Sequence, residues 1–260
     1  MKNVRPLLFF VSLLLIVGLA CRFGADTPPP QTERPIETRE PTIAPEPTEE
    51  PTELPTLELT ELPTEVPFML DYFTEEFDQD PGELWLSRIS GPGADAHASS
   101  VKTEFSDSRM RIELPERDLY FYYFYLGNTY ENVRIDLRAD NRGVNTNNVS
   151  LICRVGDDGW YEWSVGSGGD WILYARTDKY NLMAKGGTTY LKQGKEVNEY
   201  GLECKDNTIR MFINGQEIKQ SPFTDKKYGL RDGAVAFNIS SLHVTPVVVE
   251  VDWFKVSEAE

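Results

Sequence analysis

The sequence has few of the residues that most often supply catalytic or metal chemistry. Its 260 residues include two histidines and three cysteines. His97 and His243 are isolated in predicted loops, and no cysteine belongs to a Cys-x-x-Cys pair, so neither a catalytic histidine nor a metal site is expected. Ser167 lies in a Gly-rich turn and does not match the Gly-x-Ser-x-Gly pattern of a nucleophile. We therefore predict no cofactor, and Asp157-Asp158 fits a charged hairpin tip better than a Ca²⁺ site.

Basic clusters are lacking as well. The formal net charge is -16, and no run of Lys and Arg forms a stripe that would neutralise phosphates. The sequence therefore excludes nucleic acid as an expected partner, and it argues against adsorption of the folded part to anionic lipid. An acidic balance of this kind is typical of a soluble extracellular protein.

Long apolar runs are confined to the N-terminus. Lys2 and Arg5 precede an apolar run over residues 7–19, which is short for a membrane span but suits an export signal. The run ends in Gly18-Leu19-Ala20-Cys21, which resembles a bacterial lipobox, where the cysteine is lipidated and becomes the new N-terminus. We predict that residues 1–21 are a lipoprotein signal peptide and that Cys21 anchors the exported protein in the cell membrane, with the rest extracellular or periplasmic. An ordinary cleaved signal, or an uncleaved anchor, is the alternative.

Proline is sparse except in one segment. Of the 17 prolines, eleven lie between Pro28 and Pro67, where the sequence repeats approximately as Pro-Thr-Glu. Proline fixes φ and removes a hydrogen-bond donor, and dense glutamate repels itself, so neither helix nor sheet is favoured. We predict a disordered Pro/Thr/Glu-rich stalk over residues 22–67, able to reach on the order of 100 Å if extended. A tether without a required length is the alternative.

From residue 68 onward the pattern changes to the period of two that is typical of β-strands. Residues 132–139 alternate between apolar and charged side chains, which indicates a strand with one buried face. Asn214-Gly215 predicts a tight hairpin turn. Because no amphipathic helical stretch of useful length is present, we predict that residues 68–260 form an all-β antiparallel two-sheet sandwich. Further strands are predicted over residues 148–155, 160–165, 171–177, 199–205, 208–213, 234–239 and 247–256.

Two cysteines remain if Cys21 carries lipid. By the period-two rule Cys153 shares a face with Leu151, and Cys204 shares one with Leu202, so both are expected to point into the core. In an exported chain we predict a disulfide between them. Two buried free thiols are the alternative.

The predicted hairpin across residues 156–159 decides which side chains share a face. An odd loop places Cys153 opposite Trp163 and Arg154 opposite Glu162, whereas an even loop would put Glu162 among core residues. Because burying an unpaired carboxylate is costly, we prefer the odd register. The same reasoning at the next turn adds two residues from the following strand. The predicted ligand-binding face consists of Arg154, Trp160, Glu162, Ser164, Tyr174 and Arg176.

Planar rings beside polar groups on this face are what sugar recognition needs. An ordinary solvated face with Arg–Glu cross-strand pairs is the alternative. The aromatic run Tyr120–Tyr125 places rings on both faces of one strand. One set should be core, and the other either extends the ligand platform or lies beneath a loop.

Three parts of the chain carry a family resemblance: residues 150–155 with 159–162, residues 202–204 with 208–215, and the closing Val251-Asp252-Trp253-Phe254-Lys255-Val256. Together they are similar to the concanavalin A-like lectin/glucanase superfamily. Within it they resemble the laminin-G-like and 3-keto-disaccharide hydrolase-like domains of bacterial surface lipoproteins. The resemblance implies a two-sheet jelly roll whose concave sheet commonly meets glycans, and function still has to be argued from the site.

The last predicted strand tests for an enzyme of this superfamily. Its retaining glucanases carry Glu-x-Asp-x-(x)-Glu, with carboxylates on one face. Glu250 and Asp252 share a face, but Phe254 or Lys255 stands where the third acid belongs. We therefore predict a non-catalytic surface module that binds carbohydrate or envelope polysaccharide. The alternatives are a glycoside hydrolase-like enzyme that depends on Glu162 or Glu250, and a protein-docking adhesion or scaffold module with a large exposed apolar patch.

Overall fold

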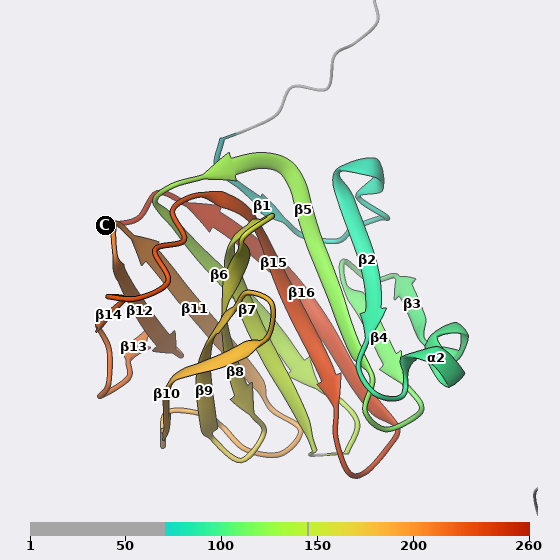
Figure 1. Cartoon of the computed structure of the whole chain (residues 1–260). Coiled ribbons are helices and arrows are strands. Elements are labelled where there is room, and N and C mark those ends of the chain that lie inside the picture. Colours follow the sequence, from blue (N-terminus) through green and yellow to red (C-terminus); the bar gives the residue numbers. More distant parts are fainter. Residues whose placement is uncertain (1–70, 145) are drawn as a thin grey trace, which may run out of the picture. The chain divides into compact units, whose positions relative to one another are not determined.

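Two antiparallel β-sheets pack face to face in the part of the chain that the computed structural model describes, residues 71–144 and 146–260 (Figure 1). The predicted signal peptide, Cys21 and the stalk over residues 22–67 lie outside the described residues. All described residues belong to one unit, Pro63–Glu260. The prediction of an all-β two-sheet jelly roll is confirmed.

Sheet A has the strand order β13-β12-β11-β6-β16-β4-β3, with β1 paired to β16 and β14 paired to β12. Its strands are β1 (Phe73–Glu75), β3 (Lys102–Phe105), β4 (Met110–Leu114), β6 (Val133–Asn141), β11 (Val197–Lys205), β12 (Thr208–Ile213), β13 (Gln216–Glu217), β14 (Phe223–Thr224) and β16 (Val247–Ser257).

Sheet B has the strand order β10-β9-β8-β7-β15-β5-β2. Its strands are β2 (Trp85–Ser90), β5 (Tyr120–Tyr130), β7 (Asn147–Gly156), β8 (Gly159–Gly166), β9 (Asp170–Arg176), β10 (Tyr180–Gly187) and β15 (Gly233–Ser241).

Helical structure among the described residues is limited to short connections. They are α2 (Ala94–His97) and the 3-10 turns Gly82–Leu84 and Ala98–Ser100. Within residues 71–144 and 146–260, no helix has the length and apolar character needed to cross a membrane.

The core lies between the two sheets and is built by the alternation seen in the sequence. In β6 every second side chain, Val133, Ile135 and Leu137, is fully buried, while the residues between them are partly exposed. The Asn214-Gly215 turn joins β12 to β13 with positive φ angles of 51° and 75°, as the hairpin prediction requires.

The predicted disulfide between Cys153 and Cys204 is present. Cys153 belongs to β7 of sheet B and Cys204 to β11 of sheet A, so the bond ties the two layers together across the core. Their Cα atoms are 6.7 Å apart, and both side chains are fully buried.

The outer face of sheet A carries a network of ion pairs that includes Glu250 and Asp252. Glu250 accepts from Arg109 at 3.1 Å and from Arg111 at 2.9 Å. Asp252 pairs with Arg109 at 3.0 Å and with Arg138 at 2.8 Å. Carboxylates held by cations in this way stabilise the sheet surface, and they lie on a different sheet from the predicted ligand face.

Candidate active site

The hairpin between β7 and β8 differs in register from the prediction. Cys153 pairs with Tyr161, Leu151 pairs with Trp163, and Ile152 pairs with Glu162. A β-bulge lies between Cys153 and Gly156, and Asp157-Asp158 form a two-residue tip between paired glycines. The bulge inserts one extra residue into β7. The side chains of β8 therefore keep the faces predicted for them, but Arg154 and Val155 exchange faces.

Arg154 is therefore not part of the ligand face, and its assignment there was wrong. Its φ is 58°, and its side chain is 2% exposed. The guanidinium donates to the backbone oxygens of Leu230 at 2.7 Å and Glu131 at 3.0 Å. Val155, expected in the core, packs instead beside Trp160 on the outer face of sheet B.

Replacing Arg154 tests this structural role. We expect Arg154→Met to lower the free energy of unfolding by about 1–3 kcal/mol, because the buried carbonyl oxygen of Leu230 loses its donor. Catalysis or sugar binding by the folded fraction should be unchanged. Thermal unfolding and ligand titration of the variant measure both effects. A stable variant that no longer binds sugar would return Arg154 to the site.

Sheet B is curled so that its outer face is hollow. Strands β10 and β5 are separated in the sheet by four others, which corresponds to about 24 Å along a flat sheet. Yet the hydroxyls of Tyr180 on β10 and Tyr122 on β5 lie 2.5 Å apart. Two tyrosine side chains cannot bridge the flat distance, so the sheet must bend. Extra residues in β5, β7 and β10 interrupt the strand pairing and allow the bend.

A pocket of about 290 Å³ lies in this hollow. We call it the sheet B pocket. Side chains from strands β5, β7, β8, β9, β10 and β15 line it, so strands far apart in the sequence build one site. The lining residues are Tyr120, Tyr122, Asn148, Glu162, Ser164, Tyr174, Tyr180, Ser240 and Leu242.

Glu162 is the one carboxylic acid in the lining of this pocket. Its side chain accepts hydrogen bonds at Oε2 from Trp160 Nε1 at 3.1 Å and from the Tyr180 hydroxyl at 3.3 Å. The residue is 5% exposed. Burial raises the pKa of the Glu162 carboxyl above its usual value, although hydrogen bonds from Trp160, Tyr180, Ser150 and Tyr122 favour the charged form.

Buried polar residues support the floor of the pocket. The Asn238 amide donates to the backbone oxygen of Phe121 at 3.1 Å, and Asn238 Oδ1 accepts from Ser240 at 2.6 Å and Ser150 at 3.5 Å. Asn238 and Ser150 are almost completely buried. Because each partner fixes the next, the network holds Ser150 beside Glu162 in a defined position.

Aromatic rings close the hollow on one side of Glu162. The Trp160 ring lies edge-on to Tyr122 and Phe124, with centroids 6.2 and 6.3 Å away, and the Tyr122 and Phe124 rings are stacked. The Arg176 guanidinium lies over Trp160 at 4.5 Å. The outward half of the Tyr120–Tyr125 run thus extends the aromatic platform, while Phe121, Tyr123 and Tyr125 belong to the main core.

The structure brings five of the six predicted residues to one face. Glu162 pairs with Tyr174 and Trp160 with Arg176 across β8 and β9, and Ser164 follows on β8. The sequence analysis missed Tyr180, because no residue of β10 is buried and the strand is bulged between Leu182 and Ala184, so its alternation is weak. It also missed Asn148, the first residue of a predicted strand, and Ser240, which lies one residue beyond the strand predicted over residues 234–239.

A second acid for hydrolysis is not within reach on this face. Asp170, exposed at the start of β9, is four residues from Tyr174, the partner of Glu162, or about 13 Å along the strand. Paired glycosidase carboxylates are about 5–5.5 Å apart in retaining enzymes and about 6.5–9.5 Å apart in inverting ones. Among residues 71–144 and 146–260 no cluster of three His, Cys, Asp or Glu side chains could hold a metal ion.

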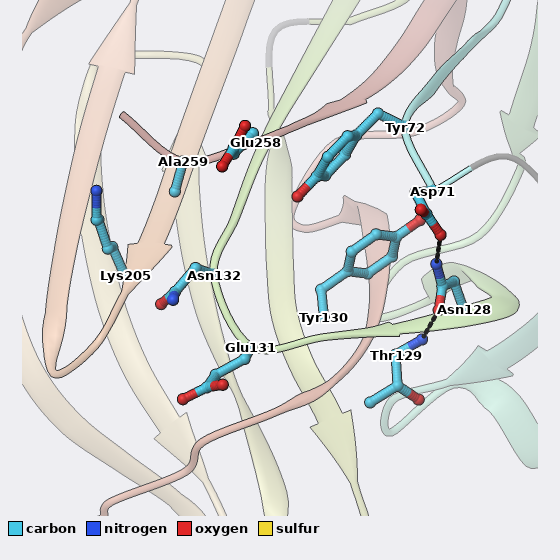
Figure 2. Close-up of a pocket in the computed structure, with 10 residues that line it drawn as sticks. All are labelled: Asp71, Tyr72, Asn128, Thr129, Tyr130, Glu131, Asn132, Lys205, Glu258 and Ala259. Atoms are coloured by element: carbon cyan, nitrogen blue, oxygen red, sulfur yellow. Dashed lines mark hydrogen bonds between the residues drawn. The ribbon is translucent and has the colours of Figure 1, made fainter.

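A larger cavity of about 420 Å³ lies elsewhere, where Tyr72 stacks on Tyr130 (Figure 2). Figure 2 shows Asp71 accepting a hydrogen bond from Asn128, at 3.2 Å. The acidic side chains of this cavity, on Asp71, Glu131 and Glu258, are exposed. Solvent screens exposed carboxylates, so this cavity lacks the buried acid that distinguishes the sheet B pocket.

No protein-family model matches the chain, and no curated protein matches it. Among solved structures it is similar to a Bacillus subtilis protein of unknown function with a galectin-like fold, at a TM-score of 0.56 and 12% identity over 72% of this chain and 94% of that one. It is also similar to a Bacteroides ovatus mixed-linkage glucan enzyme of glycoside hydrolase family 16, bound to a product. The TM-score is 0.55 and the identity 12%, over 71% of this chain and 99% of that one. A third similar structure is a Bacillus licheniformis β-glucanase, with a TM-score of 0.54 and 14% identity over 72% of this chain and 98% of that one.

At these identities the likeness shows the fold, which is the concanavalin A-like jelly roll expected from the sequence. The prediction of a non-catalytic module was wrong by this comparison, because several of the similar structures are glucan-hydrolysing enzymes. They favour the alternative prediction, a glycoside hydrolase-like enzyme. The missing third acid after Asp252 misled the sequence analysis, since the hollow face belongs to the other sheet.

Proposed function

We propose that this protein is a glycoside hydrolase-like enzyme that acts on neutral glycans in the sheet B pocket, with Glu162 as the proton donor. One observation carries the proposal: a buried carboxyl of raised pKa lies in a hollow lined by aromatic rings and hydroxyls. A carboxyl whose pKa is raised keeps its proton to higher pH than an ordinary glutamate, which suits it to general acid catalysis.

The pocket offers what a neutral sugar needs. Tyrosine rings can contact the apolar CH face of a pyranose, while Asn148, Ser164, Ser240 and the tyrosine hydroxyls can bond its hydroxyl groups. Burial raises the pKa of Tyr122 and Tyr180, so both phenols stay protonated and can donate. Because no Lys or Arg lines the pocket, an uncharged sugar fits better than an acidic one.

Glu162 would transfer its proton to the glycosidic oxygen as the bond from that oxygen to the anomeric carbon breaks. The resulting carboxylate is stabilised by the Trp160 N–H and the Tyr180 hydroxyl, which already point at Oε2. Water then supplies hydroxide to the anomeric carbon and returns its second proton to Glu162. The proton balance closes over one turnover.

Charge on the anomeric carbon calls for a second group. Most glycosidases use a second carboxylate, and a tyrosine serves in some. In the sheet B pocket the Tyr180 hydroxyl donates to Glu162 Oε2 at 3.3 Å. We assign Tyr180, which Tyr122 holds in place, the role of orienting the Glu162 carboxyl, because its neutral phenol carries no negative charge to offset that on the anomeric carbon. We further propose that a lipid anchor at Cys21 and the stalk over residues 22–67 display this enzyme outside the cell.

The direct test is a hydrolysis assay of the purified full-length protein in detergent. Neutral β-linked glucans, suggested by the glucanases that share the fold, are the first substrates, and new reducing ends are the readout. Release of reducing ends that is lost in Glu162→Gln is the expected result. Binding without turnover across neutral and amino sugars would contradict the proposal.

The pH dependence follows from the raised pKa of Glu162. We expect kcat/KM to fall as pH rises through that pKa, because the proton donor ionises, and the midpoint of the fall should lie above the ordinary glutamate pKa. Initial rates measured across pH give the midpoint. A midpoint at the ordinary glutamate value would show that Glu162 is not the acid.

A further inference from the structure

The hollow of sheet B has a direction. Since the curl brings β10 toward β5, its axis runs along the strands. Cross-strand pairing orders the side chains along that axis. We call residues that pair across neighbouring strands a row. The first row is Asn148–Ser240–Tyr120, the second is Ser164–Ser150–Asn238–Tyr122, and the third is Tyr174–Glu162–Ile152–Ala236–Phe124. Trp160 and Arg176 form the row beyond Glu162.

The row beyond Glu162 is filled. Trp160 packs against Tyr122 and Phe124 across the hollow, and Val155 packs against the same cluster. Tyr180 also belongs to this row, because it pairs with Arg176, and its hydroxyl reaches back across the hollow to that of Tyr122 in the second row. Both Trp160 and Tyr180 hydrogen-bond Glu162 directly, so no sugar-sized space separates the carboxyl from this wall.

The pocket extends in the other direction. Beside Ser164 and Tyr174 of the second and third rows, its lining includes Tyr120, Asn148 and Ser240 of the first row and Leu242 of the loop after β15. A glycan can therefore enter past Asn148 and Ser240, but it cannot continue past Glu162.

We infer that the sheet B pocket is blind and accepts the end of a glycan chain, so that the enzyme removes terminal sugar residues and does not cut within a chain. This inference rests on the proposed function for its catalytic part, and on the pocket geometry alone for its binding part. A through-going groove would let several protein molecules bind along one polymer, whereas a blind pocket binds once at each recognised end.

A chain-length series separates these cases without relying on turnover. The full-length Glu162→Gln protein is titrated calorimetrically with β-linked glucose oligosaccharides from a disaccharide to a hexasaccharide, and then with the polymer. We expect one protein per chain at every length and an affinity per chain that stays constant. Several proteins per polymer chain, or failure to bind any member of the series while binding a cyclic glucan, would overturn the inference.

Analysis of the products that the wild-type protein forms is a second test of whether it cleaves at chain ends. Release of monosaccharide from the hexasaccharide with no cleavage of a cyclic glucan supports the inference, and internal cleavage overturns it. Absence of hydrolysis would contradict the proposed activity. The number of proteins bound per glycan chain would still show whether the pocket is blind. The variant Trp160→Ala with Phe124→Ala removes the wall, and its number of proteins per polymer chain should rise from one to several.

Discussion

Glu162→Gln should reduce glycan hydrolysis by a factor of about 10²–10⁴, the range that a positioned general acid contributes. Glutamine keeps the size of the side chain and an oxygen that Trp160 and Tyr180 can still bond, but it has no proton to transfer. Steady-state kinetics should show the loss in kcat with KM little changed, because the substrate contacts remain.

The same variant should be at least as stable as the wild type at neutral and alkaline pH. Burial raises the pKa of Glu162 in the folded state, so the wild-type protein is free of the ionisation penalty below the ordinary glutamate pKa. It loses stability as pH rises through the raised value. Glutamine cannot ionise, so the stability difference should grow in favour of the variant with pH. Thermal unfolding across pH measures this.

Asp170→Asn is the matched control. It neutralises an acid on the outer face of the neighbouring strand β9, which is exposed and does not line the pocket. Its kinetics should match those of the wild type. An equal loss of activity in both variants would mean that net negative charge on this face, and not proton transfer from Glu162, supports turnover.

Removing the disulfide should lower the free energy of unfolding by about 4 kcal/mol in the chain-entropy model, since Cys153 and Cys204 are 51 residues apart. The bond closes a loop that includes the hairpins of β8, β9 and β10, so it restrains the unfolded chain strongly. Denaturant unfolding of Cys153→Ala with Cys204→Ala, at fixed pH, gives the change.

The control for the lost side-chain volume is the wild-type protein with its disulfide reduced and both thiols left unmodified. It lacks the cross-link but keeps both sulfur atoms in the core, whereas the double variant also leaves small voids. The two should lose most of the same stability. If the reduced protein unfolds at the denaturant concentration of the oxidised one, the disulfide does not stabilise the fold.

The sequence by itself determined the class of fold and much of its local detail. The alternation over residues 132–139 gave β6 and its buried face, and Asn214-Gly215 gave a turn that needs positive φ. The parity of Leu151 and Leu202 placed Cys153 and Cys204 in the core, where they pair. These features depend on residues that are close in the sequence, so the alternation of apolar and polar residues predicts them directly.

Only the tertiary structure decided the site. The bulge after Cys153 removed Arg154 from the face, and Gly233 permits it, because a Cβ there would lie 2.4 Å from the Val155 backbone oxygen. Tyr122 and Tyr180 are 58 residues apart and meet because sheet B curls. Periodicity tells which face a side chain occupies, but curvature and strand order arise from packing of the whole sheet. They convert a flat row of polar and aromatic residues into a pocket around Glu162.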